Sequence, residues 1–199
     1  QISFFCFHEI LTKDIVYVSS GEGTTSQGDF HEALNWASNS KAPVIFHIQD
    51  NEYAISTHRS EQTASSIYNM TAGYVNLVRY DVDGTDFFET SLAFKEAVQR
   101  ARKGKGPSVI ISRVVRLLAH SSSDDQRKYR NEKALAEDIK KDPLLVLESK
   151  CIKENFIAKD QFEKIRNQVD QQVDADAEWA ESQDYPNPDS AMNHIYSDL

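Results

Sequence analysis

The sequence predicts an α/β fold, in which a doubly wound, mostly parallel sheet is flanked by helices and followed by C-terminal helices. One observation is a set of short apolar runs typical of buried strands, at 14–19, 44–48, 77–82 and 108–115. The other is a set of amphipathic stretches with helical spacing, two of which separate consecutive runs. Strands that alternate with helices favour parallel βαβ units, and this alternation predicts the doubly wound sheet.

Local signals define the elements in chain order. Ser26 can cap the helix that follows the first strand, with Asp29 in its first turn. The core residues expected on this helix are Phe30, Leu34, Trp36 and Ala37, with His31 on the solvent side.

The remaining elements follow from the same signals. Residues 51–69 form a polar connection without periodicity, typical of a binding loop or a simple surface loop, and we assign no role to His58 or Arg59. Asp86 can cap a helix at 87–103. Further helices are expected at 131–141, from Asp142 onward, and at 156–182.

The composition argues against several classes of function. The 199 residues suffice for one domain with a substantial core, and the formal net charge of −9 disfavours general nucleic-acid binding. No apolar run approaches the ~20 residues that a transmembrane helix needs, and the first residues lack the features of a signal peptide. The two cysteines, Cys6 and Cys151, are isolated, which argues against a disulfide framework and fits a reducing cytoplasm.

A glycine turn, Gly21-Glu22-Gly23, follows the first strand, and the second strand ends in Gln49-Asp50-Asn51. Glycine permits positive φ and close approach of the backbone, and N–H groups at the start of a helix suit a phosphate. Glu22 and Asn51 supply hard oxygen ligands for Mg²⁺ or Ca²⁺ at strand ends, where parallel sheets bind ligands. A diphosphate bridged by Mg²⁺ fits these residues, although the glycine turn alone more often marks an ordinary loop.

Together these residues resemble the thiamine diphosphate motif, in which GDG or GEG is followed by paired asparagines. The longer match, from Gly21 to Ser56, is similar to the alpha part of the first, decarboxylating component of 2-oxo acid dehydrogenases. The GEG form is more typical of its branched-chain and fused alpha–beta members. The resemblance implies Mg²⁺ ligation by Glu22, Asn51 and the Tyr53 carbonyl, and cofactor contacts from Gly21, Gly23, Thr24 and Ile55.

Two positions depart from that motif. Asp50 stands where the family has its first asparagine, and Glu52 stands where glycine is common. Neither change removes a ligand, but the two carboxylates alter the charge around the expected site.

A second polar stretch, RLLAHSSSDDQRKYR, runs from Arg116 to Arg130 after the last strand. His120 is a candidate proton donor, because a histidine side chain in general can gain or lose a proton near neutral pH. On spacing alone, the simpler interpretation is a flexible polar loop. The stretch also resembles the phosphorylation loop of the same family, with matches at Arg116, His120, Ser121, Ser123, Asp124, Asp125, Tyr129 and Arg130.

This second match implies roles for three residues. His120 would face the thiazolium end of the cofactor and assist acyl transfer to lipoyl-lysine. Arg116 would hold the loop near the cofactor. Ser121 would be a regulatory phosphosite, where a phosphate adds about −1.5 to −2 charge beside His120.

The resemblance covers about 14–185 and implies oxidative decarboxylation of a branched-chain 2-oxo acid with reductive acylation of a lipoyl group. It implies thiamine diphosphate and Mg²⁺ as cofactors. The implied partners are a beta subunit or beta half, the lipoyl acyltransferase component and a small 2-oxo acid, in a homo-oligomer without nucleic acid or membrane. The expected compartment is the bacterial cytoplasm, or the mitochondrial matrix in a eukaryote.

Family members carry a long segment before the glycine turn, and their cofactor-activating glutamate lies in the beta part. We therefore expect residues 1–130 to be an N-terminally truncated diphosphate-binding domain, with residues 131–199 as its helical extension. We also expect a helix within 1–13 before the first strand, and a chain that is inactive alone.

Other functions remain open on the sequence alone. A pyruvate or acetoin dehydrogenase would carry the same motifs. A non-catalytic metal or nucleotide-binding module could use Glu22 and Asn51 without any reaction. A pure interaction domain, with the acidic helices as its surface, would respond to neither Mg²⁺ nor thiamine diphosphate.

Overall fold

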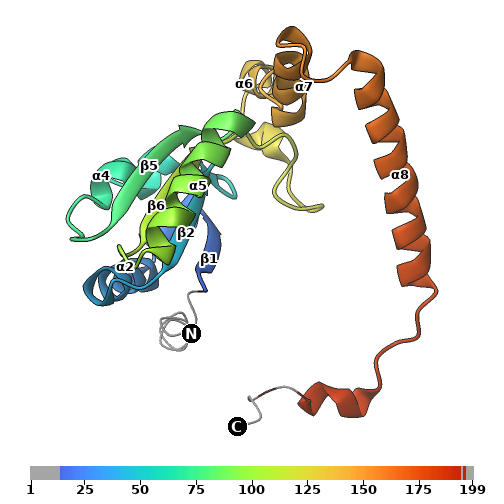
Figure 1. Ribbon diagram of the computed structural model, residues 1–199. Coiled ribbons are helices and arrows are strands. Elements are labelled where there is room, and N and C mark those ends of the chain that lie inside the picture. The colour runs from blue at the N-terminus through green and yellow to red at the C-terminus, as the bar shows by residue number, and fades with distance from the viewer. Residues whose placement is uncertain (1–13, 194, 196–199) are drawn as a thin grey trace. The chain divides into compact units, whose positions relative to one another are not determined.

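The computed structural model describes residues 14–193 and 195 (Figure 1). The helix expected within residues 1–13 lies outside this described part. No helix in the described part is long and apolar enough to cross a membrane.

The central element is a sheet of four parallel strands in the order β1-β2-β6-β5. The strands are β1 (Val16–Gly21), β2 (Val44–Asp50), β5 (Val78–Asp83) and β6 (Ser108–Arg113). Their register pairs Val16 with Val44, and Ser108 with both Ile45 and Val78. The predicted parallel sheet is confirmed, and each strand begins or ends within about two residues of its expected position.

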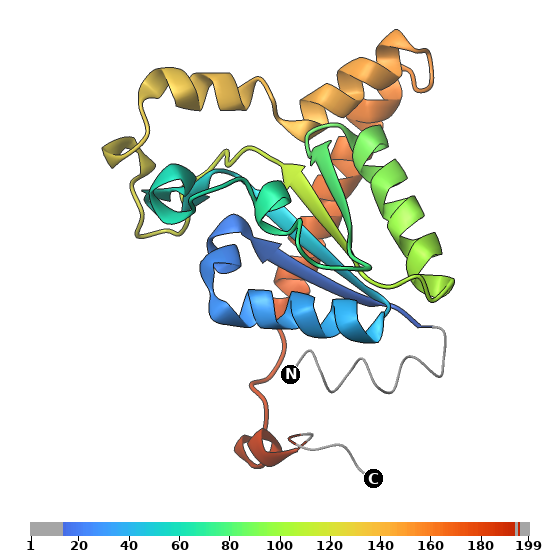
Figure 2. The ribbon, with the colours of Figure 1, turned by 90° about the vertical axis from the view of Figure 1, so that its left-hand side faces the viewer.

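Helices cover both faces of this sheet (Figure 2). On one face, α2 (Gly28–Ser40) and the short α4 (Ile67–Met70) pack through Phe30, Leu34 and Ile67 against β2 and β6. On the other face, α5 (Phe87–Arg102) packs through Ala93 and Ala97. The connections β1–α2–β2 and β5–α5–β6 run in opposite directions along the sheet. Because such crossovers share one hand, their helices lie on opposite faces, which confirms the doubly wound arrangement.

Three local expectations about α2 are corrected. Ser26 does not cap the helix, because it belongs to a 3₁₀ turn, η1 (Glu22–Ser26), and Gln27 occupies the N-cap position without a side-chain bond. Trp36 is 49% exposed, because it lies two residues beyond Leu34 and points away from the sheet. His31 is half-buried, with Nδ1 3.2 Å from the Tyr74 hydroxyl.

The polar connection at 51–69 contains more structure than the sequence predicted. It holds a two-stranded hairpin, β3 (Tyr53–Ala54) and β4 (Thr57–His58), followed by α3 (Arg59–Gln62) and α4. The expected cap of α5 is present, since Asp86 accepts bonds from the N–H groups of Phe88 and Glu89.

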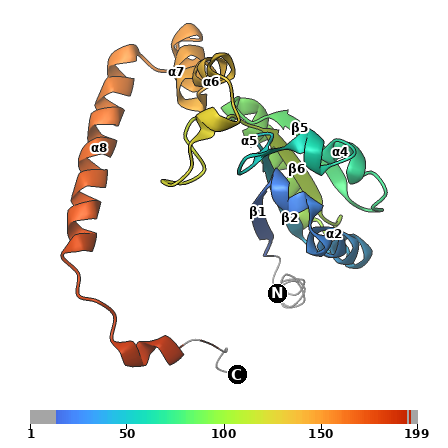
Figure 3. The same ribbon diagram turned by 180° about the vertical axis from the view of Figure 1, so that it is seen from behind.

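The C-terminal part is helical, as expected. It contains η2 (Gln126–Lys128), α6 (Glu132–Ile139), α7 (Pro143–Lys153), α8 (Lys159–Glu181) and η3 (Pro188–Met192). The chain divides into two compact units, 1–149 and 150–199. In the second unit α8 is an uninterrupted helix with no buried residue (Figure 3). The domain boundary at residue 130 stays a prediction.

Candidate functional site

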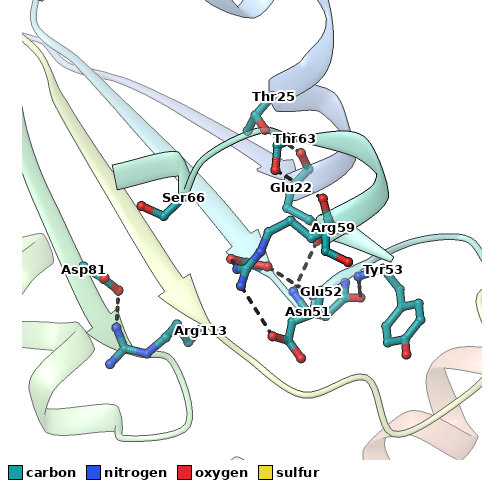
Figure 4. A network of polar contacts seen from close by, with 12 residues as sticks. Glu22, Thr25, Asn51, Glu52, Tyr53, Arg59, Thr63, Ser66, Asp81 and Arg113 are labelled. Atoms are coloured by element: carbon teal, nitrogen blue, oxygen red, sulfur yellow. Dashed lines mark hydrogen bonds and ion pairs between the residues drawn. The ribbon is translucent and has the colours of Figure 1, made fainter. Parts of the chain in front are cut away.

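Glu22 and Asn51 meet at the carboxyl edge of the sheet. Glu22 opens η1 directly after β1, and Asn51 follows β2. Because β1 and β2 are parallel neighbours, their ends lie side by side, and the Glu22 carboxylate Oε2 accepts the Asn51 backbone N–H at 3.2 Å (Figure 4). The structure thus brings together two of the predicted metal ligands.

The Glu22 carboxyl lies in an environment that disfavours its charged form. It is only 2% exposed, and this burial raises its pKa. The backbone N–H groups of Glu22 and Asn51 lower the pKa in part, the Asp50 charge raises it, and the Arg116 charge lowers it. A cation at this place would therefore stabilise the ionised carboxylate.

The two glycines of the turn do not use the positive φ that glycine permits. Gly21 is extended, with φ −86°, and the positive φ glycines of the described chain are Gly104 and Gly106. Gly23 instead provides the close approach, because a Cβ there would lie 2.8 Å from the Ala54 Cβ. Thr24 is exposed on the same turn.

Asn51 also begins the hairpin that carries the next predicted residues. Its Oδ1 accepts the Tyr53 N–H at 3.2 Å, which forms a tight turn between side chain and backbone. Ile55, at the tip between β3 and β4, has φ 57°. A β-branched residue rarely adopts this conformation, and such strain gathers at functional sites.

The polar loop after β6 is fastened to this hairpin. Arg116 donates from Nη1 to the Ile55 carbonyl at 2.8 Å and from Nη2 to the Tyr129 hydroxyl at 2.6 Å. Its guanidinium lies 5.6 Å from the Tyr53 ring centre, and buried Arg130 lies 5.3 Å from the same ring. Specific contacts of Arg116 and Arg130 therefore join this loop to the hairpin.

His120 and Ser121 lie on the exposed side of that loop. The His120 backbone N–H donates to Asp124 at 2.9 Å, and the Ser121 hydroxyl is 3.1 Å from that of Ser123. Asp124 also accepts the Tyr129 hydroxyl at 2.5 Å, and this bond, followed by that of His120, lowers the pKa of its carboxyl. Within the described residues, the structure does not bring His120 into contact with Glu22.

A cavity of about 390 Å³ opens at the ends of β2 and β6. Of the predicted residues, Asn51 and Arg116 line it, together with His47, Gln49, Gly84, Thr90, Ser112, Val114, Val115 and Pro143. The buried Arg116 Nε has no hydrogen-bond partner among the described residues. The Arg116 guanidinium gives the cavity wall a positive charge, which fits an anionic ligand.

Three of these lining residues were missed from the sequence. His47, Gln49 and Ser112 are polar positions within otherwise apolar strands, and this was their only sequence signal. His47 bridges the Tyr17 hydroxyl at 2.8 Å and the Ser112 hydroxyl at 2.9 Å, and its burial lowers its pKa. The cavity wall on this face therefore carries a neutral imidazole.

The residues at the strand ends fit Mg²⁺ with a diphosphate. They offer one carboxylate, one carboxamide and a backbone carbonyl, which are the hard oxygen ligands that Mg²⁺ takes alongside phosphate. No group of three or more His, Cys, Asp or Glu side chains able to hold a metal occurs in the described part. The predicted set contains only one such residue, Glu22.

Comparisons with known proteins point to one family. The family model of the dehydrogenase E1 component matches residues 11–189. The 2-oxoisovalerate dehydrogenase subunit alpha of Bacillus subtilis (strain 168) is 38% identical over 188 residues, which is 93% of this chain and 56% of that protein. The pyruvate dehydrogenase E1 component subunit alpha of Staphylococcus aureus (strain Mu50 / ATCC 700699) is 35% identical over 181 residues, 90% of this chain and 49% of that protein.

Among solved structures, transketolase from Campylobacter jejuni subsp. jejuni NCTC 11168 matches with a TM-score of 0.48 and 18% sequence identity, over 56% of this chain and 18% of that one. The chain spans about half the length of the curated relatives that it matches. The family match covers the sheet, the strand-end residues and the loop from Arg116 to Arg130. The chain belongs to the dehydrogenase E1 component family.

Proposed function

We propose that this chain is the diphosphate-binding part of a thiamine diphosphate-dependent 2-oxo acid dehydrogenase of the alpha type. The observation that carries the proposal is the contact between Glu22 and Asn51 at the ends of adjacent parallel strands. The contact joins the buried Glu22 carboxylate to the Asn51 backbone, and it lies at the sheet edge where doubly wound folds bind ligands, which supports the proposal.

In this proposal, Mg²⁺ is held by the Glu22 carboxylate, the Asn51 side chain and the Tyr53 carbonyl. Gly21, Gly23 and Thr24 border the diphosphate, for which the backbone supplies N–H donors. Thiamine diphosphate supplies the ylid and the electron sink when bound. The chain's own residues bind the diphosphate end, orient it and supply charge around it.

The loop from Arg116 to Arg130 forms the other wall of the proposed site. Arg116 holds the loop on the hairpin through Ile55 and Tyr129, and it also lines the cavity. His120 would hold or transfer a proton near the reacting end of the cofactor. Its exposed position requires the rest of the enzyme to complete that end, and a phosphate on neighbouring Ser121 would add negative charge there.

The proposed reaction is oxidative decarboxylation of a 2-oxo acid with transfer of the acyl group to a lipoyl group. The partners would be a beta subunit or beta half and the lipoyl acyltransferase component, within a homo-oligomer. A branched-chain substrate is favoured by the 38% identity to a 2-oxoisovalerate dehydrogenase subunit. Pyruvate is the second candidate, because a pyruvate dehydrogenase subunit is 35% identical.

Substrate profiling of the complete E1 enzyme that contains this chain tests the proposal. We expect release of CO₂ from branched-chain 2-oxo acids that requires thiamine diphosphate and Mg²⁺ and is lost in Asn51→Ala. Faster turnover of pyruvate would select the second candidate. If the folded complete enzyme decarboxylates no 2-oxo acid, the non-catalytic binding module becomes the better account.

A further inference from the structure

The expected metal site carries two carboxylates, Asp50 and Glu52, at positions where the resembled motif has uncharged residues. Both carboxylates pair with the same side chain, Arg59. The Asp50 side chain is 3% exposed and forms an ion pair with the Arg59 guanidinium. The Glu52 carboxylate lies 3.4 Å from the other terminal nitrogen of Arg59. The single guanidinium of Arg59 thus forms ion pairs with both carboxylates that depart from the motif.

The backbone around this pair is also fixed. Asp50 Oδ1 accepts the Glu52 N–H at 3.0 Å, and the Arg59 N–H donates to the Glu52 carbonyl at 2.8 Å. Glu52 has φ 69°, a conformation in which glycine is favoured. These bonds hold the strained turn on either side of Asn51.

The helix that begins at Arg59 reaches the glycine turn as well. The Gln62 side chain at its end donates from Nε2 to the Gly23 carbonyl at 3.1 Å. A single short segment therefore contacts both strand ends that would bind the cofactor.

The charges of Asp50, Glu52 and Arg59 should affect how tightly an anionic ligand binds beside them. Asp50 directly precedes Asn51, the proposed metal-binding residue. If Arg59 lost its charge, the buried Asp50 carboxylate would be an unpaired anion next to a bound diphosphate. Like charges that are partly removed from water repel strongly at short range. A carboxylate at this position therefore needs a counter-ion if a diphosphate is to bind beside it.

We propose that Arg59 is the counter-ion that allows Asp50 and Glu52 to stand beside a diphosphate site, and that it acts as a positioning residue for Asn51. This inference rests on the proposed function. It assigns a role to Arg59, whose two partners, Asp50 and Glu52, are the charged residues that depart from the motif.

The proposal predicts different effects on the binding of thiamine diphosphate and on the binding of the metal ion. In Arg59→Gln, the added net negative charge should weaken binding of thiamine diphosphate at saturating Mg²⁺ by roughly tenfold. The same charge should leave binding of Mn²⁺ alone unchanged or make it tighter, because a cation is attracted by unpaired carboxylates. Loss of folding or packing would weaken both.

The test uses the complete E1 enzyme, with calorimetry for thiamine diphosphate and electron paramagnetic resonance for Mn²⁺. Asp50→Asn added to Arg59→Gln should restore cofactor affinity, because asparagine carries no charge and its Oδ1 can still accept the Glu52 N–H. Arg113→Gln is the matched control, since Arg113 forms an exposed ion pair with Asp81 on the same sheet and should leave cofactor affinity unchanged (Figure 4).

Each outcome supports or overturns the inference. Unchanged cofactor affinity in Arg59→Gln, loss of both ligands, or absence of rescue by Asp50→Asn would overturn it while leaving the proposed function intact. If Arg59→Gln does not fold, Asp50→Asn alone should bind the cofactor at least as tightly as the unchanged enzyme, and weaker binding would contradict the role. Failure of the unchanged enzyme to bind thiamine diphosphate would overturn the proposed function, and this inference with it.

Discussion

Glu22 is a buried acid, and its contribution to the free energy of unfolding should depend on pH. Burial raises its pKa above the ordinary 4.5, so the folded state prefers the protonated carboxyl. A raised pKa contributes stability that is fully present below 4.5 and is lost as the pH rises through the folded value. Without metal, ionisation of this buried carboxyl therefore lowers the stability of the fold.

Glu22→Gln tests whether ionisation of Glu22 lowers the free energy of unfolding as the pH rises. The variant should gain stability relative to the unchanged chain as the pH rises from about 4 to about 7, because the amide stays neutral over this range. Urea unfolding of the metal-free chain at several pH values measures the difference. A difference that does not change with pH would show that Glu22 does not titrate as its burial implies.

Gly23 should be intolerant of a side chain for reasons of packing. In Gly23→Ala, the new Cβ would meet the Ala54 Cβ at 2.8 Å, and we expect destabilisation of about 1–3 kcal/mol. Gly21→Ala is the matched control, because its Cβ would have no neighbour within 4 Å. Thermal unfolding of both variants decides the question, and equal melting temperatures would refute the close approach.

The sequence alone identifies some residues of the candidate site and misses others. Glu22 and Asn51 could be found because both stand at the ends of apolar runs. Arg59 could not, since its partners are defined by the hairpin that folds it back onto Asp50. Ser26 was misassigned as a cap because a 3₁₀ turn moves the N-cap of α2 one residue further, to Gln27.

The loop from Arg116 to Arg130 and the β3–β4 hairpin behave as one polar assembly. Arg116 joins them through the Ile55 carbonyl and the Tyr129 hydroxyl, with both aromatic rings of Tyr53 and Tyr129 beside its guanidinium. Bonds made by a charged group are each worth about 1.5–3 kcal/mol. Loss of this one side chain should therefore release the loop.

Arg116→Ala should raise amide hydrogen exchange in residues 117–130 by about tenfold or more. Arg127→Ala is the control, because Arg127 is exposed and pairs only locally with Asp125. Exchange followed by mass spectrometry compares the two. Equal exchange in both variants would mean that the hairpin contact does not order the loop.

The strands were easier to predict than this assembly. Continuous apolar runs such as Val44–Ile48 allow few alternatives to a buried strand. The hairpin was missed because its two strands have only two residues each, and its two-residue turn holds Ile55 in a conformation that isoleucine seldom adopts.

The two units of the chain differ in how much core they contain. The sheet and its covering helices bury the apolar residues of β2, β6, α2 and α5. By contrast, α8 buries no residue and exposes Ile165, Val169 and Val173 at helical spacing. Burial of apolar area is the main favourable term in folding, so α8 gains little stability from packing within its own unit.

Truncation after Ala158 tests this division. Removal of α8 and the residues beyond it should shift the melting temperature of the remaining chain by less than about 2 °C. Circular dichroism should lose helical signal in proportion to the deleted segment. A much larger drop in melting temperature would show that α8 stabilises the sheet unit.

The central claim is that the ends of β1 and β2 bind a diphosphate through Mg²⁺. The most direct test is calorimetric titration of thiamine diphosphate into the complete E1 enzyme that contains this chain, with and without Mg²⁺, beside Glu22→Ala and Asn51→Ala. We predict binding that requires Mg²⁺ and weakens by about tenfold to a hundredfold in each variant. Binding that is indifferent to Mg²⁺ and to both substitutions would contradict the assignment of this site.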